Sequence, residues 1–395
     1  MTTRIQDAVR EQSPVPEFQP GLENVVLSET RLSRVDGQRG ELVLAGFPLE
    51  EIAPKATYEE MVFLLWTGRL PKSSELEAFR RELAERRGIP GSTVELLRRA
   101  AARKVAPMDA LRMAAGTLDL LDDPAPSRFE NEALSVVARF PGLVAAYARL
   151  CEGQEPLAPR PELSLAAGFL YRLHGEEAGE EAVRALDTYL STVIDHGANA
   201  STFTARVIVS TRSDLISAVV GALGALKGPL HGGAPGPALD MVFEIGRPER
   251  AEEVLRGKLE AGERLMGFGH RVYKVRDPRA AVLGAAARRL FQDGSGTADP
   301  QLYELALEVE KVALKLLAEY KPGRRLDTNV EFYTALLLHG LGLPSDQFTP
   351  LFAMGRAAGW LAHCREQQET GRLIRPRLHY SAPEDGVFVP LEERV

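Results

Sequence analysis

The stretch "SDLISAVVGALGALKGPLHGG", residues 213–233, joins a helix-forming run to a glycine turn that contains a histidine. Small and apolar residues predict a helix over 213–228, which Ser213 can cap and Gly228 can end. Pro229 prevents the helix from continuing, and Gly232 and Gly233 lack a Cβ, so a ligand can approach the backbone beside His231. The run therefore predicts a helical protein with His231 on a rigid turn. A histidine without a functional role, in an ordinary glycine-containing loop, fits this stretch about equally well.

The same helical periodicity recurs along most of the chain. Apolar residues at three- and four-residue spacing predict helices, each closed by Gly, Pro or Asp, over 57–68, 73–88, 108–123 and 141–153. Strand-like alternation is confined mainly to 42–49 and to the preceding stretch 23–40, where "DG" and "RG" mark turns. These patterns predict a nearly all-α fold with a minor N-terminal β element.

Loop-rich breaks indicate how the helices are divided. One break is the glycine turn at 228–236, and the others lie between 291 and 329, in "FQDGSGTADPQ" and "YKPGRRLDTN". We therefore expect a large helical domain whose first part is 1–227, a small inserted domain over 228–326, and a second part of the large domain over 327–395.

The composition limits the function classes. The 395 residues are 45% hydrophobic, with a net charge of −7 and a pI near 5.7, which argues against general binding to nucleic acid or to a membrane surface. The basic runs "RRELAERR" and "RRAAARK" are better explained as solvated helix faces than as a nucleic-acid site. Only two cysteines occur, and neither a signal-type N-terminus nor an apolar run of about 18 residues is present, so we expect a soluble, cytoplasmic protein.

Several polar residues stand where a purely structural explanation is weak. The stretch "MGFGHRVYKVRDPRA", residues 266–280, places glycines beside His270 and several cations, which suits an anionic ligand with a phosphate tail. Arg356 lies alone among small and aromatic residues, and Arg375 and Arg377 lie near the C-terminus. Arginines without an adjacent acid suggest a ligand carboxylate. Glu331 is different. It begins an apolar helix, and a carboxylate that only stabilises the helix dipole is the better explanation of this residue from this stretch alone.

Metal ligands are not indicated. The seven histidines include no HxxxH pair and no cluster with cysteine, so we expect no metal site.

Taken together, the ordered segments resemble the citrate synthase family from about Gly21 to Tyr380. The segments that carry the resemblance are "SETRLSRVDGQRGELVLAGFPLEEIA", "LLWTGRLP", "APMDALR", "DHGANASTFTARVIVSTRSDL", "GPLHGGA", "MGFGHRVYKVRDPRA", "NVEFY", "FTPLFAMGRAAGWLAH" and "RPR". The resemblance implies a nearly all-helical homodimer with a large domain and a small inserted domain that closes over the substrates. It also implies acetyl-CoA and oxaloacetate as substrates and no cofactor.

The resemblance assigns catalytic roles to His231, His270 and Glu331. His231 would stabilise the enol or enolate of acetyl-CoA, His270 would polarise and protonate the ketone of oxaloacetate, and Glu331 would take a proton from the acetyl methyl group. The oxaloacetate carboxylates would be held by His196, Arg279 and Arg356, helped by Arg375 from the partner subunit. The CoA-binding residues would be Met266, Gly267, Phe268, Gly269 and Lys274.

Departures from the family pattern leave alternatives open. The family usually has Asp where this chain has Glu331, Gly197 stands where Glu is common, and "GGAPGP" replaces "GGANE". The leading expectation is a citrate synthase of the tricarboxylic acid cycle. A 2-methylcitrate synthase that uses propionyl-CoA is the second, because one methylene changes discrimination by only about 1 to 3 kcal/mol. A non-catalytic paralogue that binds CoA is the third, and the intact set of histidines and arginines argues against it.

Overall fold

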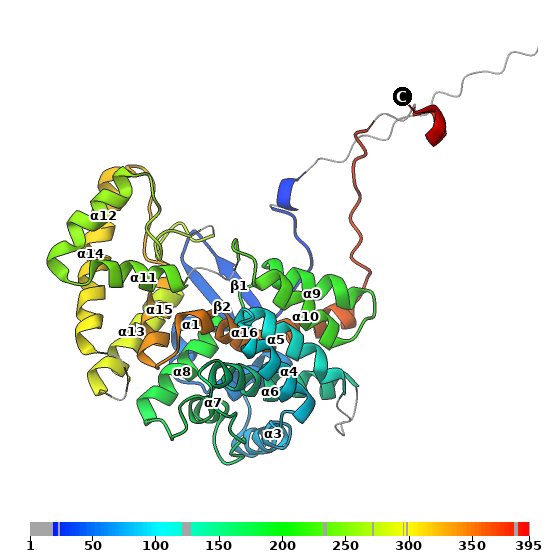
Figure 1. Cartoon of the computed structure of the whole chain (residues 1–395), viewed down its shortest axis with the longest axis horizontal. Helices are drawn as coiled ribbons and strands as arrows, with labels where there is room; N and C mark the ends of the chain where they lie inside the picture. Colours follow the sequence, from blue (N-terminus) through cyan, green and yellow to red (C-terminus); the bar gives the residue numbers. More distant parts are fainter. Residues whose placement is uncertain are drawn as a thin grey trace, which may run out of the picture.

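The computed structural model describes residues 19–22, 24–120, 128–231, 235–270, 272–294, 296–297, 299–382 and 386–394. Within these residues the chain is nearly all helical (Figure 1). The helices are α1 (Leu49–Ile52), α2 (Tyr58–Thr67), α3 (Ser73–Glu85), α4 (Gly91–Ala102), α5 (Pro107–Ala115), α6 (Arg128–Cys151), α7 (Leu165–His174), α8 (Glu180–Val193), α9 (Ala200–Ser210), α10 (Leu215–Leu226), α11 (Pro235–Ile245), α12 (Ala251–Glu260), α13 (Pro278–Asp293), α14 (Pro300–Tyr320), α15 (Val330–Gly340) and α16 (Phe348–Thr370), with short 3₁₀ turns η1 (Pro20–Leu22), η2 (Gly116–Leu120), η3 (Pro248–Arg250), η4 (Ser345–Gln347) and η5 (Leu391–Glu393).

The only sheet in the described part of the chain is a small antiparallel one near the N-terminus, with the strand order β1 (Ser33–Asp36), β2 (Glu41–Leu44), β3 (Phe47–Pro48). Ser33 pairs with Leu44 and Asp36 with Glu41. The turn between β1 and β2 lies against the loop after His270, where the Lys274 N–H donates a hydrogen bond to Gly37 O at 2.8 Å. The prediction of a nearly all-α fold with a minor N-terminal β element is confirmed.

Helix α16 is the centre of the larger helical body. It packs against α6, α8 and α9, and its buried residues include Trp360 and Arg356. A Cβ on Gly359 would lie 2.1 Å from Ile194 O, so only glycine allows the helix to approach the segment after α8 so closely. The helix therefore brings Arg356 next to the loop that carries His196.

The chain from α11 to α15 forms a second group of helices, which lies beside the larger body in Figure 1. Helix α12 packs on α14, α13 packs on α15, and α13 also contacts α8 of the larger body. The candidate site residues come from both groups. Whether the domain boundaries fall at 228 and 326 stays a prediction.

Local details differ from the expected helices. Asp214, not Ser213, caps α10, because its carboxylate accepts a hydrogen bond from Ser217 N at 2.6 Å. Helix α6 includes Pro141 in its interior, whereas the sequence predicted that a helix would begin there. Helix α5 ends at Ala115 and continues as a 3₁₀ turn.

Helix α6 is also the one helix in the described residues that is long and apolar enough to cross a membrane by length and composition. Of its most apolar window, 83% is buried inside the protein. Its apolar side chains are therefore covered by the surrounding helices, as in a core helix.

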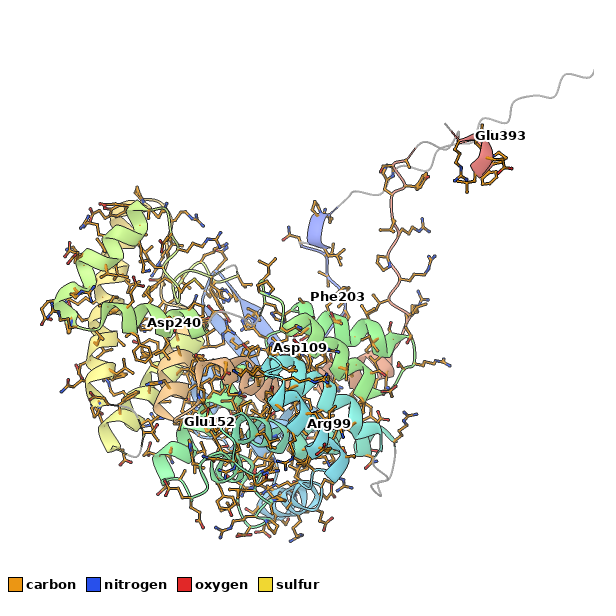
Figure 2. The ribbon with its side chains drawn as sticks, in the orientation of Figure 1. Arg99, Asp109, Glu152, Phe203, Asp240 and Glu393 are labelled. Atoms are coloured by element: carbon orange, nitrogen blue, oxygen red, sulfur yellow. The ribbon has the colours of Figure 1, made fainter. Side chains whose placement is uncertain are left out.

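After α16 the chain leaves the helical body. The C-terminal segment runs outward on the same side as η1 (Figure 1), and Glu393 lies at its far end (Figure 2). Exposed apolar residues on this segment include Leu378, Tyr380 and Phe388.

Candidate active site

A cavity of about 450 Å³ lies where the larger body meets the α11–α15 group. Seven of the predicted site residues line it: His196, His231, Gly269, His270, Arg279, Glu331 and Arg356. They come from the loop before α9, the turn after α10, the loop before α13, and helices α13, α15 and α16. The fold therefore brings together residues that are far apart in the sequence.

His231 is held by the N-terminus of α9. The Ser201 N–H lies 3.3 Å from the His231 Nε2 atom, and the Ser201 hydroxyl lies 2.8 Å from the same atom. A backbone N–H can only donate, so Nε2 is the acceptor and we assign the ring proton to Nδ1. Burial, with Arg356 adding to it, lowers the pKa of His231. The ring is therefore a neutral donor at neutral pH.

His270 is fixed in the opposite tautomer. Its Nδ1 atom accepts hydrogen bonds from Val272 N at 3.0 Å and Tyr273 N at 3.1 Å, so the proton lies on Nε2. Burial, followed by the charge of Arg279, lowers the pKa of His270 to about 4. The Nε2 atom lies 3.2 Å from Arg279 Nη2. Two donors that face each other at this distance need a shared acceptor, so the pair is suited to an anionic or ketone oxygen.

Arg279 is oriented by a buried acid close to it in sequence. Asp277 accepts from Arg279 Nε at 3.0 Å and from Nη2 at 2.8 Å, and Asp277 and Arg279 are both buried. Asp277 also caps α13 through Arg279 N, and it accepts from Val330 N at 3.3 Å. The guanidinium therefore has a fixed plane, with its remaining N–H groups available to a ligand.

His196 lies on the other side of this cluster. Its Nε2 atom is 3.0 Å from the Tyr273 hydroxyl, and its ring meets that of His270 edge to face at 6.1 Å. Burial, then the charges of Arg279 and Arg356, holds the pKa of His196 well below its usual value. The three candidate histidines are therefore all neutral at pH 7 and contribute hydrogen bonds without adding charge.

Glu331 does not behave as a helix cap. Asn329 caps α15, and its side chain accepts from Glu331 N at 2.9 Å. No hydrogen bond to the Glu331 carboxylate is found among the described residues. Burial raises the pKa of Glu331 to about 7, although Arg279 opposes the rise. A carboxylate that accepted backbone N–H bonds would have a lowered pKa, so the helix-dipole explanation is the weaker one.

Asn329 also connects Glu331 to His270. Its Nδ2 atom donates to Gly269 O at 2.8 Å, and Asn329 N donates to Gly267 O at 3.0 Å. Phe268 and Thr328 form a β-bridge between the same two segments. One side chain therefore caps the helix of Glu331 and fixes the loop of His270.

Arg356 is the buried cation of the larger body. Its Nε atom donates to Val193 O at 2.5 Å, and it lies 4.7 Å from the centre of the Phe352 ring. Burial lowers its pKa to about 10, so it stays charged at neutral pH. The negative charge of Asp195 opposes this lowering of the pKa, and Arg356 lines the cavity, where a ligand carboxylate could pair with it.

A second cavity, of about 540 Å³, adjoins the first and shares five lining residues with it: Arg264, Gly269, His270, Asn329 and Glu331. Met266, Gly267, Phe268 and Gly269 line it. Gly267 has a φ of 87°, and a Cβ there would lie 2.9 Å from Phe332 Cβ. This turn is therefore available only to glycine, and it leaves the backbone close to any ligand.

Two predicted residues lie outside these cavities. Lys274 is exposed and lines neither of them, although its loop borders the first. Arg375 is exposed on the C-terminal segment and does not line the cavities of its own chain. Gly232 and Gly233 lie outside the described residues, so their part in the turn stays a prediction.

The sequence reading missed the residues that orient the others. These are Ser201, Tyr273, Asp277 and Asn329, together with Arg264, Lys321 and Arg324, which line the second cavity. Asp277 and Asn329 could have been found as cap residues before predicted helices. Tyr273 gave no local signal. In the part of the chain that is described, no cluster of three His, Cys, Asp or Glu is placed to hold a metal ion.

The chain is nearly all α, and two buried arginines and three histidines line its first cavity. The family model for the citrate synthase C-terminal domain matches residues 21–377. The chain belongs to the citrate synthase family, and with it to the enzymes that transfer an acyl group.

Individual relatives agree with this membership. The chain is 42% identical to citrate synthase 2 of Bacillus subtilis over 378 residues, covering 95% of this chain and 98% of that protein. It is 37% identical to a 2-methylcitrate synthase of Mycobacterium tuberculosis, covering 94% and 93%.

Solved structures show the same fold. Citrate synthase from Pyrobaculum aerophilum matches with a TM-score of 0.85 at 37% identity and covers 100% of both chains. A ternary complex of carboxymethyl coenzyme A and oxaloacetate with the citrate synthase of Thermoplasma acidophilum matches with a TM-score of 0.85 at 32% identity, covering 96% of this chain and 100% of that one.

Proposed function

We propose that this protein condenses acetyl-CoA with oxaloacetate and water to give citrate and CoA. The observation that carries the proposal is the meeting, in one cavity, of two neutral histidine donors, one carboxylate with a raised pKa, and two buried arginines. A weakly acidic α-proton of a thioester requires a base and a preorganised donor that act together away from water. Glu331 is the proposed base, and His231 is the proposed donor.

The proposed reaction begins at Glu331. Its carboxylate removes a proton from the acetyl methyl group, while the Nδ1–H of His231 donates to the thioester oxygen and stabilises the enol or enolate. Since the pKa of Glu331 is raised to about 7, the group is a stronger base than an ordinary carboxylate and is still ionised in about half of the molecules at pH 7.

The second step forms the carbon–carbon bond. The enol carbon attacks the ketone carbon of oxaloacetate, and the Nε2–H of His270 donates to, and then protonates, the ketone oxygen. His196, Arg279 and Arg356 hold the carboxylates of oxaloacetate. Water then cleaves the thioester of the citryl-CoA product, which releases citrate and CoA. The chemistry needs no cofactor, because acid and base groups and the substrate itself supply every step.

The second cavity is the proposed CoA site. The turn of Met266, Gly267, Phe268 and Gly269 lines it beside Glu331, so a thioester that enters there reaches the base. Arg264, Lys321 and Arg324 line the same cavity and supply positive charge for phosphate groups. Lys274 stays a proposed contributor from the edge of the site.

Acetyl-CoA is favoured over propionyl-CoA by the length of Glu331. The family usually has Asp at this position, and the extra methylene would take up space beside a bound acyl group. A 2-methylcitrate synthase remains the second candidate, because the relatives include such enzymes at 37% identity. The non-catalytic paralogue is the weakest, since the proposed acid, base and anion-binding groups line one cavity.

We propose a homodimer that works in the cytoplasm, in the tricarboxylic acid cycle, without nucleic acid or membrane partners. Arg375 lies on an exposed segment that leaves the body, where it can reach a second subunit. Helix α10 offers a contact face: Gly221 packs on Ile208 of α9, whereas Gly224 has open space beside it in the described structure. Binding of oxaloacetate would draw residues 228–326 toward the larger body, since Arg279 and Arg356 come from opposite sides of the cavity.

Oxaloacetate-dependent release of CoA thiol from acetyl-CoA, with the product identified by mass spectrometry, tests this function. We expect stoichiometric thiol and citrate. Tight binding of CoA without thiol release would instead identify the protein as a non-catalytic binder.

A further inference from the structure

A buried polar network lies behind His196 and outside both cavities. Its members are Asp195, His363, Arg206, Glu366 and Gln367, each less than a tenth exposed. None of them lines the cavities, so none is placed to touch a substrate. Buried charged groups of this kind are costly unless they are fully paired.

Asp195 ties the turn that carries His196 to strand β1. Its Oδ2 atom accepts from the Ser33 hydroxyl at 2.5 Å and from the Gly197 N–H at 3.4 Å. Gly197 has a φ of 64°, so the chain turns sharply directly after the histidine. The carboxylate of residue 195 therefore closes a small turn whose central side chain is His196.

His363 is the partner that keeps Asp195 ionised. Its Nε2 atom lies 3.1 Å from Asp195 Oδ1, and because a carboxylate only accepts, the proton lies on Nε2. Burial acts to raise the pKa of Asp195, but His363 and Arg356 outweigh it and hold the pKa at about 2. The ion at position 195 therefore depends on the donor at position 363.

The orientation of His363 is fixed in turn by Arg206. Arg206 Nη1 donates to His363 Nδ1 at 3.0 Å and lies 3.3 Å from Glu366 Oε2. Its Nε atom donates to Gln367 Oε1 at 3.2 Å. With Nδ1 occupied as an acceptor, the imidazole presents its only N–H to Asp195, so the hydrogen bonds run in one direction through the network.

We infer that His363 is a positioning residue for oxaloacetate, which acts through Asp195 to set the position of His196. The inference rests on the proposed role of His196 in holding oxaloacetate. Helix α16 supports it geometrically, because Arg356 and His363 are seven residues apart and lie on the same face. The helix would thus hold oxaloacetate directly through Arg356 and indirectly through His363.

A matched pair of substitutions separates this role from general stabilisation. His363→Gln can place an amide N–H where Nε2 stands and so keep the donor to Asp195. His363→Asn can place an amide oxygen near Nδ1 and keep the acceptor for Arg206, but it is too short to reach Asp195. Both variants are polar, but Asn is one methylene shorter than Gln and leaves a larger cavity at this buried position, so the thermal unfolding midpoint is needed to separate loss of packing from loss of the hydrogen bond. Ser33→Ala, at a half-buried position on β1, removes the support of Asp195 from the other side.

The test is calorimetric titration of each full-length variant with oxaloacetate, together with KM values for oxaloacetate and acetyl-CoA and a thermal unfolding midpoint. We expect His363→Asn to weaken oxaloacetate binding about tenfold, the scale of one hydrogen bond that is weakened by displacement of His196. His363→Gln should stay closest to wild type, Ser33→Ala should fall between them, and KM for acetyl-CoA should change little.

Three results would overturn the inference. Equal loss in His363→Gln and His363→Asn, in step with the unfolding midpoint, would show a purely structural role. Unchanged binding in His363→Asn and Ser33→Ala, while His196→Ala weakens oxaloacetate, would remove the inference and leave the proposed function. Unchanged binding in His196→Ala would remove the role proposed for His196 itself, and the inference with it.

Discussion

Replacing Glu331 with Gln removes a charge and preserves the shape of the side chain. If Glu331 is the base, turnover should fall by about 10²-fold or more, the usual scale for a lost general base. Binding of oxaloacetate should change little, because the carboxylate is proposed to face the acetyl methyl group. The wild-type enzyme should also lose activity about tenfold per pH unit below pH 7, since the pKa of Glu331 is raised to about 7.

The same substitution should stabilise the protein. Because burial raises the pKa of Glu331 from 4.5 to about 7, the folded protein binds this proton more tightly than the unfolded chain does. The free energy of unfolding therefore falls as the pH rises from about 4.5 to about 7, by about 3 kcal/mol, and stays lower above that range. Glu331→Gln should remove this loss, so its advantage over wild type appears at pH 8 and is absent at pH 4.

The decisive assay follows exchange of the acetyl methyl protons of acetyl-CoA, or of a non-cleavable analogue, into deuterated water with and without an oxaloacetate analogue. Exchange at the wild-type rate in Glu331→Gln would show that another group takes the proton and that Glu331 serves only as a partner of the helix dipole. Glu331→Asp restores the usual family residue and should keep measurable activity, although a reach about 1 Å shorter can cost about 10²-fold. Glu180→Gln, which removes an exposed first-turn acid of α8, is the control and should leave exchange unchanged.

Three further outcomes are expected. If Arg375 serves the partner's site, mixing inactive Arg375→Ala and His231→Ala subunits should restore up to about a quarter of wild-type activity; mixed dimers without activity would contradict a shared site. X-ray scattering should show a smaller radius of gyration when oxaloacetate and carboxymethyl-CoA are added together, and an unchanged radius would contradict closure. Asn329→Ala should lower the free energy of unfolding by about 1 kcal/mol, because the helix cap is lost. It should also lower turnover, because the hydrogen bond to Gly269 O is lost. Full activity would show that this hydrogen bond is dispensable.

The sequence predicts the fold class well because its signals are local. Helical periodicity, the "DG" and "RG" turns and the glycine ends of helices each depend on a few neighbouring residues. The errors are local as well. Asp214 competed with Ser213 for the cap of α10. Pro141 lies inside α6, where packing of a long buried helix overcomes the usual preference of proline for helix starts.

The site was only partly predictable for a different physical reason. His231, His270 and Glu331 stand in short motifs, so the sequence points to them. The residues that orient them act across large separations: Ser201 holds His231 from another helix, and Asn329 fixes the loop of His270. The donor role of His363 toward Asp195 depends on two segments meeting in the core. No local pattern carries that information.

This protein is proposed to join an acetyl group to oxaloacetate, and a competition between two acyl-CoA substrates tests that proposal. The enzyme is given oxaloacetate with equal concentrations of acetyl-CoA and propionyl-CoA, and the two products are quantified by mass spectrometry. The ratio of products reports the ratio of kcat/KM values. We expect citrate to exceed 2-methylcitrate by about tenfold or more, because the longer side chain of Glu331 would crowd the extra methylene of a propionyl group. An excess of 2-methylcitrate, or the absence of both products, would contradict it.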